Sequence, residues 1–70
     1  GKVLAVNKES NFVVVDLGEG AGIKVGNRFR VSRDGQYVGD VEVIQIRKNI
    51  SACDIKKEII PIQIGDSVLK

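Results

Sequence analysis

The apolar residues of this sequence come in short runs, and almost every run is bounded by Gly, Asn, Asp or Pro. Runs of about four to eight Val, Ile, Phe and Leu residues between such turn formers are typical of β-strands. An amphipathic α-helix would instead place apolar residues three or four positions apart over a longer segment. The pattern therefore predicts an all-β fold, a single small six-stranded barrel.

The length of the chain limits what such a fold can enclose. Its 70 residues and 7.6 kDa are enough for one domain, and a domain of this size buries only roughly 60% of the surface of its unfolded chain. The core must be thin, with no room for a large substrate cavity. We expect residues 1–70 to be one domain taken from a longer chain, because the sequence starts at Gly1 without a methionine.

Turn formers divide the sequence into six expected strands. Gly18–Gly22 is a glycine-rich connection, and Asp34 with Gly35 is a hairpin signal. The expected strands are Lys2 to Val6, Phe12 to Leu17, Asn27 to Arg33, Tyr37 to about Arg47, Ile50 to Ile55 and Ser67 to Lys70.

The register of the hairpin at Asp34 can be predicted from the side chains that would face each other across it. A three-residue loop over 34–36 sets Phe29 opposite Val41, so that apolar meets apolar. A two-residue loop puts Phe29 against Asp40 unless a bulge near Gly39 restores the phase. The three-residue loop is therefore the predicted connection.

The strand after this hairpin changes its buried face along its length. Val41 and Val43 share one face, whereas Ile44 and Ile46 share the other. The strand must bulge after Val43 or be buried on both sides, and bent strands of this kind close small barrels. The predicted core is Val6, Val13, Val15, Ile23, Val25, Phe29, Val31, Val41, Ile44, Ile46, Ile64 and Val68.

The sequence from Ser51 to Ile60 is compatible with two structures, a strand or a short helix. A strand is favoured, but Ser51 followed by Asp54, with Ile55 and Ile59 four apart, also fits a short capped helix before Pro61. A helix in this segment would favour an OB-type barrel.

One pattern occurs twice, 39 residues apart. Residues 22–31 read G-I-K-V-G-N-R-F-R-V, and residues 61–70 read P-I-Q-I-G-D-S-V-L-K. We interpret both as one kind of turn, in which two apolar side chains plug a barrel end, a glycine takes positive φ, and Asn or Asp caps backbone amides. The residues assigned to structural turns are Gly22, Gly26, Asn27, Asp34, Gly35, Gly39, Gly65 and Asp66.

The same residues resemble the small carboxy-terminal barrel of the flagellar assembly protein T type, a module of bacterial envelope proteins. The resemblance implies an SH3-like barrel that serves as an interaction or assembly module, with no catalytic residues, and it implies a periplasmic or extracytoplasmic location. The motifs that carry it are G-K-V at Gly1, V-x-V-D-x-G at Val13, G-x-x-V-G at Gly22, F-x-V at Phe29, D-G at Asp34, V-G at Val38, S-A-x-D-I at Ser51 and G-D at Gly65.

Residues that could perform catalysis or hold a cofactor or metal are scarce. The chain has no His and one Cys, which removes the commonest general base and the usual zinc ligand sets. Gly18 to Gly22 lacks the spacing of a phosphate-binding loop. Asp40 and Glu42 face arginines, which keep carboxylates ionised and unable to donate protons. We expect a protein that is not an enzyme and has no cofactor.

The basic residues leave one alternative function. The net charge is +2, and Arg28, Arg30, Arg33 and Arg47 could bind RNA or single-stranded DNA, as small barrels often do. The chain offers few aromatic side chains on which bases could stack. Nucleic-acid binding is therefore the second hypothesis, behind a structural or protein-interaction module.

Apolar residues near the carboxy end indicate where a partner would bind. They outnumber the inward positions of so small a barrel, and Pro61 marks an edge or a break in pairing. We expect self-association, or contact with another part of the parent chain, through Ile59, Ile60, Ile62 and Ile64.

Overall fold

The computed structural model describes residues 1–69 and shows an all-β chain, with no α-helix in that range. Its six strands form one antiparallel sheet in the order β1-β2-β5-β4-β3-β6. A single 3-10 turn, η1, covers Glu19–Ala21 between β2 and β3. The strands are β1 Val3–Asn7, β2 Phe12–Val15, β3 Arg28–Arg33, β4 Gln36–Ile46, β5 Ser51–Glu58 and β6 Ser67–Leu69.

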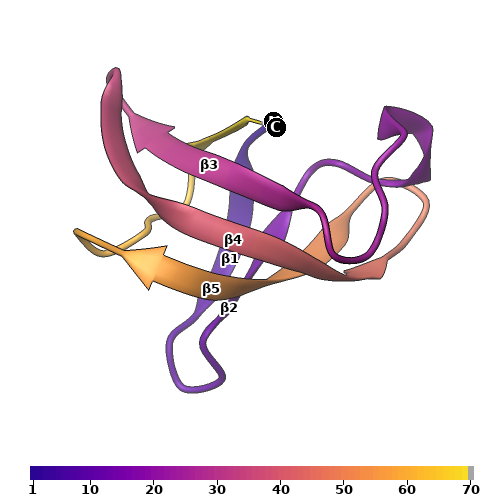
Figure 1. Ribbon diagram of the computed structural model, residues 1–70, viewed down its shortest axis with the longest axis horizontal. Helices are drawn as coiled ribbons and strands as arrows, with labels where there is room; N and C mark the ends of the chain where they lie inside the picture. Colours follow the sequence, from indigo (N-terminus) through magenta and orange to yellow (C-terminus); the bar gives the residue numbers. More distant parts are fainter. Residues whose placement is uncertain (70) are drawn as a thin grey trace.

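The sheet curls until its two edge strands meet (Figure 1). Lys2 bridges Ser67 of β6. The Gly1 amino group donates to the Val68 carbonyl oxygen at 3.0 Å, and the Val68 amide donates to the Gly1 carbonyl oxygen at 2.8 Å. These bonds complete a small barrel and bring the first residues of the chain beside β6.

The structure has a strand, β5, over Ser51–Glu58, so the helix alternative for Ser51 to Ile60 is wrong. β5 lies in the middle of the sheet, where Cys53 faces Val13 of β2 on one side and Val43 of β4 on the other. Pairing on both sides outweighs the local capping pattern at Ser51. The OB-type alternative, which rested on that helix, therefore loses its support.

The β3–β4 hairpin has the expected register but not the expected loop. Its loop has two residues, Asp34 and Gly35, with φ of 51° and 80°, which suits a tight hairpin turn. A bulge at Val38 restores the phase and sets Phe29 opposite Val41. The three-residue loop is therefore wrong, and the alternative of a short loop with a bulge is correct.

The bulge in β4 after Val43 is confirmed, because the pairing with β5 shifts at Ile44. A matching shift occurs in β1 at Leu4, between Val3 and Ala5. Each bulge turns one large aliphatic side chain outward. The prediction that Ile44 is a core residue is therefore wrong.

The barrel is filled mainly by valines. Seven predicted core residues are buried, and Val6 and Ile46 are half-buried and pack against them. Val25 and Ile64 are exposed, because the second apolar position of each turn points away from the barrel. The complete core is Val3, Val13, Val15, Ile23, Phe29, Val31, Val38, Val41, Val43, Cys53, Ile55, Ile62 and Val68.

The barrel has an approximate internal twofold symmetry. A half-turn exchanges β1 with β4, β2 with β5, and β3 with β6, and this exchange preserves the order of strands around the barrel. The two bulges, Leu4 and Ile44, are equivalent, and so are the two copies of the repeated turn. The axis passes through the β2–β5 pair Val14 and Ala52, which face each other. Residues 1–33 and residues 36–69 are therefore two similar half-barrels.

Candidate interaction surface

The first copy of the repeated turn, residues 22–27, attaches to β4. Gly26 has φ of 95°, and its amide donates to the Val43 carbonyl oxygen at 2.8 Å. The Val43 amide donates to the Asn27 carbonyl oxygen at 2.8 Å. The Asn27 side-chain oxygen accepts a hydrogen bond from the Lys24 amide at 3.0 Å.

The second copy, residues 61–66, attaches to β1 in the same way. Gly65 has φ of 94°, and its amide donates to the Val3 carbonyl oxygen at 2.8 Å. The Val3 amide donates to the Asp66 carbonyl oxygen at 2.9 Å. The Asp66 carboxylate accepts from the Gln63 amide at 2.8 Å. The interpretation as one turn built twice is confirmed for the positive φ and the capping oxygen, but only the first apolar residue of each copy, Ile23 or Ile62, lies in the core.

Only the second turn contains a buried charge. The Asp66 side chain is 3% exposed and forms two hydrogen bonds with the Arg33 guanidinium, at 2.7 and 2.9 Å. Arg33 also donates to the Pro61 carbonyl oxygen at 2.8 Å. The hydrogen bonds from Arg33 hold the pKa of Asp66 below its ordinary value. Arg33 thus fastens the second turn to the end of β3.

The other predicted turn glycines have separate roles. Gly22 ends η1 with φ of 70°, and Gly35 lies in the hairpin loop. Gly39 is inside β4 rather than in a turn, and a Cβ there would lie 2.1 Å from the Lys57 carbonyl oxygen. A Cβ on Gly18 would collide with the Lys48 backbone in the same way. These two glycines permit close approach of neighbouring segments.

The exposed aliphatic side chains include two equivalent pairs. In the first turn Val25 is 65% exposed, and it adjoins the β4 bulge at Ile44, which is 44% exposed. In the second turn Ile64 is 70% exposed, and it adjoins the β1 bulge at Leu4, which is 45% exposed. The hydrogen bond from each turn glycine to the strand residue before the bulge places the backbones of each pair next to each other.

Small apolar residues connect the two bulges on the outside of the barrel. Ala5 faces Val14, Val14 faces Ala52, and Ala52 faces Gln45 across adjacent strands. Ala5 is exposed. Val14 and Ala52 are half-buried, and each lies between two buried residues of its strand, so their side chains point to the outside of the sheet. These residues and the two aliphatic pairs lie on the outside of β1, β2, β5 and β4 and in the two turns, along a surface that curves around half of the barrel. We call them the outer apolar face: Leu4, Ala5, Val14, Val25, Ile44, Ala52 and Ile64.

The segment from Ile59 to Ile64 is divided between the core and the surface. Ile62 is buried in the core and cannot contact a partner, because it is the first apolar position of the second turn. Ile60 is half-buried and packs against the core. Ile59 is exposed near Val38, at a different place from Ile64. Of the four predicted interface residues, only Ile64 belongs to the outer apolar face.

The four arginines proposed to bind nucleic acid do not converge. Arg28 and Arg30 share the outer side of β3, where Arg28 lies 3.2 Å from the Glu42 carboxylate and Arg30 lies 5.4 Å from the centre of the Tyr37 ring. Arg33 is at the opposite end of β3 from Arg28 and is held by Asp66. Arg47 follows Ile46, the last residue of β4.

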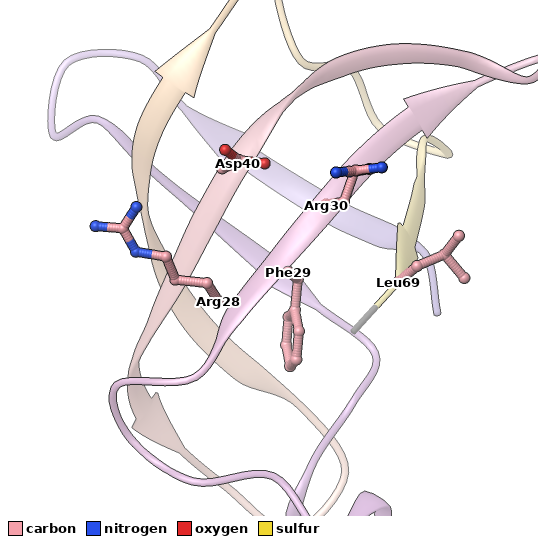
Figure 2. A pocket seen from close by; sticks show the side chains of 5 residues that line it. All are labelled: Arg28, Phe29, Arg30, Asp40 and Leu69. Carbon is pink, nitrogen blue, oxygen red and sulfur yellow. The ribbon is translucent and has the colours of Figure 1, made fainter.

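A shallow hollow lies on the same side of β3 (Figure 2). Figure 2 shows the guanidinium groups of Arg28 and Arg30, both on β3, pointing in different directions, with Asp40 on the neighbouring strand β4. Phe29 contributes to the wall, although its side chain is a core residue. The hollow thus combines both signs of charge and does not present a cationic cleft.

Within residues 1–69 no group of three or more Cys, Asp or Glu side chains could hold a metal ion. Cys53 is buried, and that burial raises the pKa of its thiol to about 11, with a further contribution from Asp54. A thiol of this kind is unreactive at neutral pH. Across the same residues no helix is long and apolar enough to cross a membrane.

The candidate site is the outer apolar face, whose aliphatic residues are arranged about the axis at Val14 and Ala52. Sequence reasoning found Ile64 and the repeated turn but missed Leu4, Ala5, Val14 and Ala52 as outer residues. Alternation with Val6, Val13 and Val15 already places Ala5 and Val14 outside, whereas Leu4 and Ile44 point outward only because each bulge shifts the alternation by one position. No family model, curated protein or solved structure matches this chain.

Proposed function

We propose that this chain is a non-catalytic assembly module that associates with a second copy of itself through the outer apolar face. The observation that carries the proposal is the exposure of two equivalent aliphatic pairs, Val25 with Ile44 and Ile64 with Leu4. A monomeric protein normally covers such side chains or scatters them singly.

The arrangement of the face supports a second copy as the partner. Contacts between identical subunits are usually twofold, so one patch must be complementary to itself. The outer apolar face already repeats its aliphatic residues about an axis at Val14 and Ala52. The resemblance to an SH3-like envelope module favours the same class of function. The nucleic-acid alternative has no comparable support, because its arginines lie apart and Arg33 is occupied by Asp66.

Sedimentation velocity from micromolar to millimolar concentration tests the proposal. We expect the unmodified chain to associate, and Leu4→Lys combined with Ile44→Lys to remain monomeric with an unchanged far-ultraviolet circular dichroism spectrum. Ile59→Lys is the matched control, because Ile59 is 58% exposed but lies outside the face. A chain that stays monomeric at every concentration, or a double variant that associates like the parent, would contradict the proposal.

A further inference from the structure

Neither half-barrel can form its sheet alone. Within residues 1–33 β1 pairs with β2, but β3 has no partner strand, and within residues 36–69 β4 pairs with β5, but β6 has none. β3 pairs instead with β4 and β6, and β2 pairs with β5. Each half therefore depends on the other for the partners of its last strand.

The hydrogen bonds of the repeated turn also cross between the halves. The turn at Gly26 is bonded to Val43, and the turn at Gly65 is bonded to Val3. The buried ion pair joins Arg33 of the first half to Asp66 of the second. All of these contacts depend on the two halves being adjacent, and none of them requires both halves to belong to one chain.

One exposed turn is the whole covalent connection between the halves. Asp34 and Gly35 link β3 to β4 directly, and both residues are exposed. Both have positive φ, and Asp34 is one of two such non-glycine residues in the described chain. If this turn opened, β3 would continue into β4 and carry residues 36–69 away from their own first half.

We propose that a second copy of this chain is a partner for the exchange of half-barrels. In the exchanged dimer, residues 1–33 of each chain pair with residues 36–69 of the other, which forms two complete barrels. The strand pairs, turn bonds and ion pair within each barrel are those of the monomer, and only the Asp34–Gly35 turn is lost. Exchange of this kind is a low-cost route to dimers. This inference is independent of the outer apolar face.

The ion pair between the halves allows a direct test with two full-length variants. R33D places a carboxylate against Asp66, and D66R places a second guanidinium against Arg33, so each variant alone disrupts its own barrel. In an exchanged dimer of the two variants, one barrel regains the native Arg33 and Asp66, and the other receives both replaced side chains with opposite charges.

Both variants carry Leu4→Lys and Ile44→Lys, so association through the outer apolar face does not contribute. They are unfolded, mixed at equal amounts and refolded together at high concentration. We expect a species with the mass of two chains, containing one of each, and folded β-signal on the order of tenfold above that of either variant refolded alone. A mixture that equals the sum of the two separate refolding reactions would overturn the exchange.

A second measurement uses the connecting turn in the same Leu4→Lys, Ile44→Lys background. Gly35→Val forces a β-branched residue into a position with φ of 80°, which opposes the closed turn but fits an extended connection. We expect a several-fold larger dimer fraction after refolding at high concentration. Gly22→Val is the matched control, since Gly22 has φ of 70° and open space for a Cβ but lies between η1 and β3 within one half. Equal dimer fractions in the two variants would also count against the proposal.

Discussion

The two copies of the repeated turn have the same backbone and different chemistry. Gly26 and Gly65 have nearly identical φ, 95° and 94°, and each turn is bonded to the neighbouring strand at 2.8 Å. The first turn ends in Asn27, which is exposed and neutral. The second ends in Asp66, which is buried with Arg33.

This difference shows that the turn itself needs only a glycine followed by a side chain with an acceptor oxygen. Asn27 and Asp66 accept the same kind of bond, from the amide three residues earlier. The charge is not required for the shape of the turn. It serves the contact between the turn and the end of β3, which only the second copy makes.

The largest contrast is expected when the capping side chains are removed. Asp66→Ala should lower the free energy of unfolding by about 2 kcal/mol, because it removes the buried carboxylate that accepts hydrogen bonds from Arg33 and from the Gln63 amide. Asn27→Ala should cost about 1 kcal/mol, the value of one side-chain hydrogen bond. Urea denaturation of both variants measures the difference. Equal losses would show that the ion pair adds nothing to the second turn.

The two turns should respond alike when their glycines are replaced. Gly26→Val and Gly65→Val should each cost about 2 kcal/mol, because a β-branched residue is strained at positive φ. A Cβ at either position has no atom within 4 Å, so the cost is conformational rather than steric. Gly20→Ala is the control, as Gly20 also has open space but no positive φ. Denaturant midpoints that differ strongly between the two turns would break the equivalence.

Of the two turns, only the second should contribute to the pH dependence of stability. The pKa of Asp66 is below its ordinary 3.8 in the folded protein, so its contribution is complete above that value and is lost as pH falls through the lowered pKa. Asp66→Asn should flatten the acid side of the stability profile, and Asn27→Ala should only shift it downward. Some slope will remain from Glu58, whose pKa is lowered mainly by its hydrogen bond with Lys8. A profile unchanged by Asp66→Asn would contradict the assignment.

The smallest effects are expected at the second apolar position of each turn. Val25→Ser and Ile64→Ser should each change the free energy of unfolding by less than about 0.5 kcal/mol, because both side chains are exposed. Ile23→Ser and Ile62→Ser provide the contrast, since these first positions are buried and should be strongly destabilising. A large loss at Val25 or Ile64 would place these residues inside the barrel.

The sequence predicted the strands, the Phe29–Val41 register and the repeated turn, because each depends on residues close in the chain or directly opposite. It placed Val25 in the core, and Ile64 both in the core and in the interface, whereas both side chains point outward because strict alternation does not hold in the turn. It also did not reveal the contact of Arg33 with Asp66. The two are 33 residues apart, and only the pairing of β3 with β6 brings them together.

The reciprocal hydrogen bonds between Gly1 and Val68 hold the two ends of the described chain beside each other. A polypeptide enters and leaves this structure at nearly the same point (Figure 1). Domains with adjacent ends can be placed within a surface loop of a host protein without separating the two ends of that loop. The same geometry would also let a short linker close the backbone into a ring while the barrel keeps its shape.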